Sequence, residues 1–118
     1  MNIEGWNNLK LKEKETRDIF DNSDIIFLIE TWIGIGKWGI EEIDGFVVLH
    51  RERGRRASRG RHPGGLALYI RTELAGSITE LKLENGNQEM IWIKYECHGD
   101  VLALGFVYNP PALSLIHI

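Results

Sequence analysis

The residues Ile25–Ile29 form an uninterrupted run of five apolar side chains, three of them isoleucine, which ends at Glu30. Such a run is typical of a β-strand that is buried on both faces. The run VLALGFVY at 101–108 has the same character, and the two prolines that follow it cannot continue a ladder. These two runs predict a core that is built from β-sheets.

Shorter elements are predicted around these two strands. Alternating apolar and polar residues indicate the shorter strands. A helical pattern amid Lys and Glu residues indicates one helix, which is predicted to end at Asp21–Asp24. The expected elements are the end of a strand at 1–3, a helix over 9–20, and strands over 46–49, 66–71, 78–83 and 90–95. The order of the elements predicts an α/β (α+β) fold in which helices and mixed sheets form layers.

The composition is that of a globular domain, with 43% hydrophobic and 26% charged residues in 118. No apolar run approaches the roughly 18–20 residues that a membrane span needs, so we expect no membrane partner. The first residues lack the apolar segment of a signal peptide. Cys97 is the only cysteine, so we expect no disulfide partner within the chain.

Positive charge is concentrated in one segment, RERGRRASRGR at 51–61. It holds six of the 14 Lys and Arg residues and one of the 17 Asp and Glu residues, which leaves 8 basic and 16 acidic residues elsewhere. Guanidinium groups suit phosphate, so we predict contact with a DNA phosphate backbone, although a solvated loop is an equally open interpretation. The arginines are Arg51, Arg53, Arg55, Arg56, Arg59 and Arg61.

Three polar residues stand at the ends of predicted core strands, which is where ligands bind in open α/β folds. They are Asn2, Glu30 and Tyr108. Each also has a plain structural interpretation: a turn-forming Asn, a solvated Glu and an edge-packing Tyr. Taken together, carboxylate and amide oxygens suit Mg²⁺, which can polarise a phosphoryl group.

Several short motifs, taken in their order and spacing, identify a resemblance to a known family. These are NIEG at 2–5, DIIFLIETW at 24–32, DGF at 44–46, R-H-P-GGLALYIR at 61–71, E-x-x-W at 89–92 and GFVYNPP at 105–111. The series resembles the opening half of the endonuclease/exonuclease/phosphatase superfamily. The GGLALYIR and YNPP segments resemble its non-LTR (LINE-type) retrotransposon branch most.

That resemblance implies a four-layer αββα sandwich, with residues 1–111 as an N-terminal fragment of the domain. The parent would be a hydrolase, a DNA endonuclease that uses Mg²⁺ (or Mn²⁺) and nicks target DNA in the nucleus ahead of a reverse transcriptase. Asn2 would help to position the catalytic centre, Glu30 would bind the metal, and Tyr108 would contact the scissile phosphate.

The chain also departs from the family pattern. Pro111 stands where repair-type members carry Asn, and the 118 residues contain neither a Gly-Asp-x-Asn nor a Ser-Asp-His segment. We therefore expect the chain itself to be inactive. The stretch 112–118 is interpreted as a non-native tail, because LSLIHI is also the translation of a common sequencing-adaptor end; an ordinary apolar tail is the alternative.

Two other functions stay open from the sequence. One is a fragment of a phosphatase of the same fold that acts on a phospholipid or an inositol phosphate. The other is a non-catalytic remnant that binds nucleic acid or protein. A half-domain would expose an unpaired sheet edge and apolar faces, so poor solubility is expected.

Overall fold

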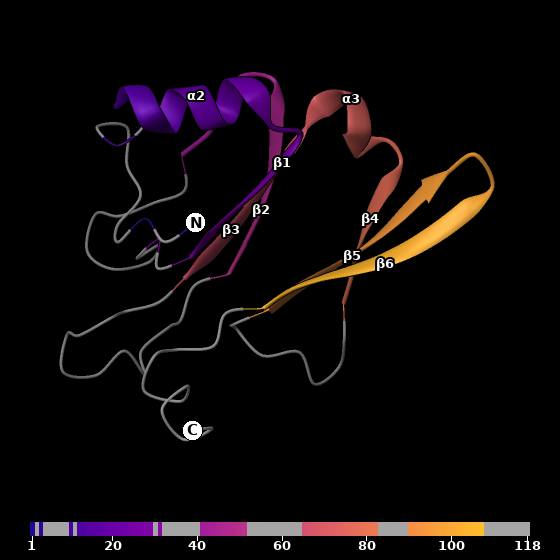
Figure 1. Ribbon diagram of the computed structural model, residues 1–118. Helices are drawn as coiled ribbons and strands as arrows, with labels where there is room; N and C mark the ends of the chain where they lie inside the picture. Colours follow the sequence, from indigo (N-terminus) through magenta and orange to yellow (C-terminus); the bar gives the residue numbers. More distant parts are fainter. Residues whose placement is uncertain are drawn as a thin grey trace, which may run out of the picture.

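The structure, a computed structural model, describes residues 1, 3, 10, 12–29, 31, 41–51, 65–82 and 90–107. These residues form a mixed α/β fold with two three-stranded sheets (Figure 1). The elements are α2 (Lys14–Asn22), β1 (Ile25–Ile29), β2 (Phe46–Arg51), β3 (Leu66–Arg71), α3 (Thr72–Ala75), β4 (Ile78–Leu81), β5 (Met90–Cys97) and β6 (Asp100–Val107). In this described part of the chain, no helix has both the length and the apolar character needed to cross a membrane.

The first sheet has β3 at its centre, in the order β1-β3-β2, and both strand pairs are antiparallel. The register places Ile25 opposite Ile70 and Ile29 opposite Leu66. All residues from Leu66 to Ile70 are buried, because β3 has a neighbouring strand on each side and a packed layer on each face.

The second sheet has the order β4-β5-β6 and is also antiparallel. Its long β5–β6 hairpin closes through His98 and Gly99, whose φ angles of 51° and 85° are the positive values that a tight hairpin turn requires. Figure 1 shows that this hairpin extends well beyond the first sheet, so only part of its length is covered by the first sheet.

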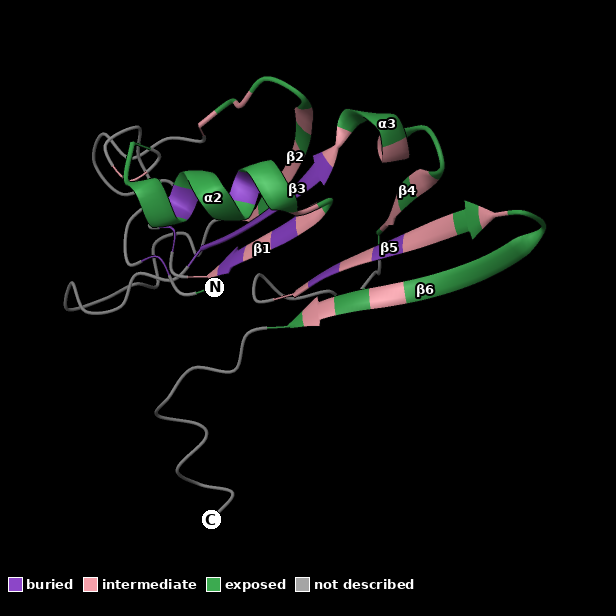
Figure 2. Cartoon of the chain, turned by 45° about the horizontal axis from the view of Figure 1, so that its top comes forward, coloured by how far each residue is buried: buried purple, intermediate pink, exposed green. Residues whose placement is uncertain are grey.

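The elements stack in the order α2, first sheet, second sheet (Figure 2). On the outer side, Phe20 of α2 meets Phe46 and Tyr69 edge to face, with ring centroids 5.3 and 5.2 Å apart. Between the sheets, Phe27 and Phe106 lie 5.3 Å apart within a second apolar cluster. The described chain therefore has two cores, one on each face of the first sheet.

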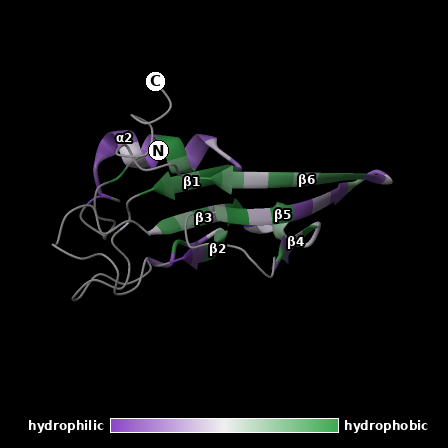
Figure 3. Cartoon of the chain, turned by 90° about the horizontal axis from the view of Figure 1, so that it is seen from below, coloured by the Kyte–Doolittle hydropathy of each residue, from purple (hydrophilic) through white to green (hydrophobic). Residues whose placement is uncertain are grey.

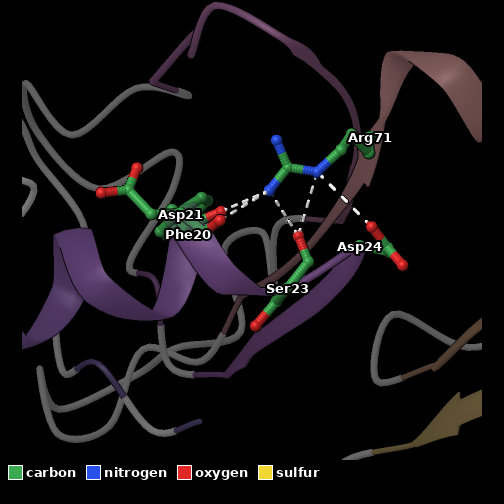
Figure 4. Close-up of polar contacts among 5 residues, drawn as sticks. All are labelled: Phe20, Asp21, Ser23, Asp24 and Arg71. Carbon is green, nitrogen blue, oxygen red and sulfur yellow. Dashed lines mark hydrogen bonds and ion pairs between the residues drawn. The ribbon is translucent and has the colours of Figure 1, made fainter.

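Arg71 joins the end of α2 to β3 (Figure 4). Its Nη2 donates hydrogen bonds to the carbonyl oxygens of Phe20 and Ser23, both at 2.7 Å. Its guanidinium carbon also lies 4.6 Å from the Phe46 ring centroid, and its Nε lies 3.5 Å from Asp24 Oδ1. One side chain thus satisfies carbonyl groups that the helix end leaves without helical partners.

Some predicted boundaries were wrong. The predicted helix over 9–20 is not continuous, because Lys10 is helical but residues 12 and 13 are not. Helix α2 begins at Lys14 and continues to Asn22, past the residue at which it was predicted to end. The Arg71 hydrogen bond to Phe20 supplies a donor at this end of the helix. The short helix α3 was not predicted, and β5 continues to Cys97, two residues further than expected.

The strand predicted over 101–108 is present as β6 (Asp100–Val107), but the prediction that it is buried was wrong. This strand is apolar along most of its length (Figure 3) but lies at the edge of the second sheet. Val101, Leu102 and Val107 are 59%, 54% and 53% exposed. Among the described residues, no element covers the outer face of this sheet.

Candidate active site at the end of β1

The end of β1 is held beside the first residues of the chain. The Ile29 N–H donates to the Met1 carbonyl oxygen at 2.7 Å, and the Ile3 N–H donates to the Ile29 carbonyl oxygen at 3.1 Å. This alternation is that of a parallel pair. The residues that flank Asn2, and Ile29, which precedes Glu30, therefore lie side by side at one edge of the first sheet.

Thr31 follows Glu30 and is anchored on its other side. Its N–H donates to the Gly65 carbonyl oxygen at 3.2 Å, and its side chain is completely buried. Its Oγ1 has no hydrogen-bond partner among the described residues. An unpaired buried hydroxyl costs about 1–3 kcal/mol, so a polar partner at Thr31 Oγ1 would stabilise the chain. Only its place directly after Glu30 could have indicated Thr31 from sequence.

Asn2, Glu30 and Tyr108 themselves lie outside the described residues, as do Arg53, Arg55, Arg56, Arg59, Arg61 and the stretch 112–118. The assigned roles of these residues stay predictions. What the structure adds is the direction of the strands. Strands β1 and β6 point the same way (Figure 2), so Ile29 and Val107, their last residues, lie toward the same side of the molecule.

Arg51 is the one member of the arginine segment that the structure describes. It ends β2, and its Nη2 forms an ion pair with Glu80 Oε2 of β4, while Nη1 donates to the His50 carbonyl oxygen at 2.9 Å. The two paired side chains are 29% and 15% exposed. Arg51 thus connects the two sheets, a role that the sequence did not indicate.

Two titratable groups among the described residues have shifted pKa values, and both shifts have local causes. The Met1 amino group donates to the Phe27 carbonyl oxygen at 2.8 Å, and its partial burial lowers its pKa. A hydrogen bond with the Cys97 side chain, together with the charges of Cys97 and Asp24 and a small loss of hydration, raises the pKa of Tyr95. Tyr95 belongs to the protruding hairpin, away from the end of β1.

The described ranges contain no group of three or more His, Cys, Asp and Glu residues placed to hold a metal ion. Glu30, the predicted metal ligand, is outside these ranges. Cys97 is a free thiol. Neither the comparison with protein-family models nor the comparison with curated proteins returns a match for this chain.

Proposed function

We propose that the chain corresponds to the N-terminal half of a Mg²⁺-dependent DNA endonuclease domain from a LINE-type retrotransposon. The observation that carries the proposal is the ordered series of motifs from NIEG at 2–5 to GFVYNPP at 105–111. The Ile3–Ile29 hydrogen bond supports it, because it joins backbone that directly adjoins Asn2 and Glu30, two residues the proposal assigns to one centre.

The proposal includes a four-layer αββα sandwich for the complete domain. The described order of α2, first sheet and second sheet is compatible with three of these layers. In a complete domain, a further helical layer would cover the outer face of the second sheet, where Trp92 and Val107 now lie.

Within this proposal, side chains at the ends of the strands supply the oxygen atoms that bind the metal and contact the substrate. The carboxylate of Glu30 would be a Mg²⁺ ligand, since this ion prefers carboxylate and amide oxygens. Bound Mg²⁺ would polarise the phosphoryl oxygen of a DNA strand. Asn2 would orient the centre and Tyr108 would contact the phosphate, while the buried Thr31 directly follows Glu30 in the sequence.

A first test is a plasmid-nicking assay with the 118-residue chain and Mg²⁺. We expect no conversion of supercoiled to nicked plasmid, because the chain has no Ser-Asp-His segment to supply a general base. Wild-type chain and Glu30→Ala should be indistinguishable. Nicking that disappears in Glu30→Ala would show an active site complete within these residues and overturn this expectation.

A second test measures how binding to duplex DNA depends on salt. Each phosphate contact contributes about 0.9 to the slope of log K against log salt concentration. If Arg55 and Arg56 each contact a phosphate, Arg55→Glu/Arg56→Glu should reduce the magnitude of the slope by about 2.

Arg51→Ala is the matched control, because Arg51 is already paired with Glu80. It should leave the slope as in the wild type while lowering stability. Equal slopes for all three proteins would count against the arginine segment as a DNA contact. DNA affinity that is unaffected by removing Mg²⁺ would favour a non-catalytic nucleic-acid-binding remnant over the endonuclease proposal.

A further inference from the structure

Strand β6 is an edge strand of the kind that recruits another strand. Its eight residues pair with β5 on one side, and no strand among the described residues pairs with its other side. Every second residue of such a strand directs its N–H and C=O groups to the open edge. Asp100 is its only charged residue, and the strand has no proline, so it lacks the features that usually protect an edge.

The seven residues after Asp100 read nearly the same in both directions by size. When two copies of VLALGFV run antiparallel about Leu104, every residue lies opposite an apolar residue of similar size. The pairs are Val101 with Val107, Leu102 with Phe106, Ala103 with Gly105, and Leu104 with itself. An isologous contact with two-fold symmetry requires this self-complementarity, since the same surface is used by both partners.

The pairing of Ala103 with Gly105 is also favoured by the position of Trp92. The Trp92 ring lies directly over Gly105 on the outer face of the sheet, and a Cβ at Gly105 would come within 2.5 Å of it. A partner strand therefore needs a small residue beside this position, and Ala103 of the second copy provides one. The residues at the two ends, Val101 and Val107, are among the most exposed large apolar side chains described.

We propose that two copies of this chain associate through antiparallel pairing of their β6 strands, with the two-fold axis at Leu104. The two second sheets then become one six-stranded sheet. The pairing satisfies the open edge with backbone hydrogen bonds and covers Val101, Leu102 and Val107 with apolar partners. The assembly stops at two copies, because β5 occupies one side of each β6 strand and the partner copy then occupies the other.

The test uses two matched double variants at the exposed ends of the strand. V101K/V107K places lysine opposite lysine in both end pairs, whereas V101K/V107E places lysine opposite glutamate in both. Sedimentation should show the wild type rising from the 13.5 kDa chain mass to twice that mass with concentration. V101K/V107K should stay monomeric, and V101K/V107E should dimerise again, less strongly at high salt.

Cysteine crosslinking keeps the proposal testable if the charged variants fold poorly. With Cys97→Ser in the background, V101C/V107C should oxidise to a covalent dimer through 101–107 pairs. V101C alone should not, because two copies of position 101 lie six residues from register, about 20 Å apart. A wild type that is monomeric at all concentrations, assemblies larger than a dimer, charge variants that behave alike, or crosslinking of V101C alone would each overturn the proposal.

Discussion

Replacing Arg71 with alanine should lower the free energy of unfolding by about 3 kcal/mol, since hydrogen bonds from a charged donor contribute about 1.5–3 kcal/mol each. The change removes both 2.7 Å hydrogen bonds, to the carbonyl oxygens of Phe20 and Ser23, and leaves those oxygens without this donor. It also removes the cation–π contact with Phe46. Urea denaturation followed by circular dichroism measures the effect.

Two variants separate the parts of this effect. Arg71→Lys keeps the charge but not the forked donor, so it should recover only part of the loss. Asp24→Asn removes the other charge, but Asp24 is 75% exposed and 3.5 Å away, so it should cost less than about 0.5 kcal/mol. If Arg71→Ala unfolds with the wild-type midpoint, the hydrogen bonds at the end of α2 do not stabilise the chain. All proteins must be compared at one concentration, because self-association changes apparent stability.

Gly105→Ala should be the second most destabilising change, by about 2 kcal/mol, within the range for overpacking. An added Cβ would lie 2.5 Å from the Cη2 and Cζ2 atoms of Trp92 and 2.7 Å from its Cε2 atom. The ring must therefore leave its place over β6, where it shields the strand backbone. Denaturation gives the stability change, and Trp fluorescence reports the new ring environment.

Gly76→Ala is the control for this prediction, because it is the same chemical change at an open position. Gly76 has a φ of −66° and no atom within 4 Å of an added Cβ. It should be neutral or stabilise the chain by about 0.4–1 kcal/mol, through reduced freedom of the unfolded state. Equal effects of the two changes would show that contact with Trp92 is not the cause.

The sequence was most informative where local pattern and burial agree. The bounds of β1 and β3 follow directly from IIFLI and LALYIR. It was least informative about which face of a strand is covered. In ITEL, the register puts Glu80 opposite the buried Ile93, where it meets Arg51, and puts Leu81 opposite Trp92 on the outer face.

The candidate site was predictable only as a set of strand ends. The sequence indicated Glu30 from its place after an apolar strand, and the structure adds that Ile3 and Ile29 are hydrogen-bonded there. That contact joins residues 26 positions apart, which no local pattern specifies. The pairing of Arg51 with Glu80 was likewise inaccessible, because it depends on how two sheets stack.

The Arg71 contacts also set an order for folding. Arg71 binds the Phe20 carbonyl oxygen across 51 positions of sequence, and β3 is the strand with which β1 pairs along its whole length. Helix α2 has nine residues, too few for a stable helix in isolation. During synthesis, the N-terminal helix and strand must therefore wait until β3 has left the ribosome before they can be fixed in place.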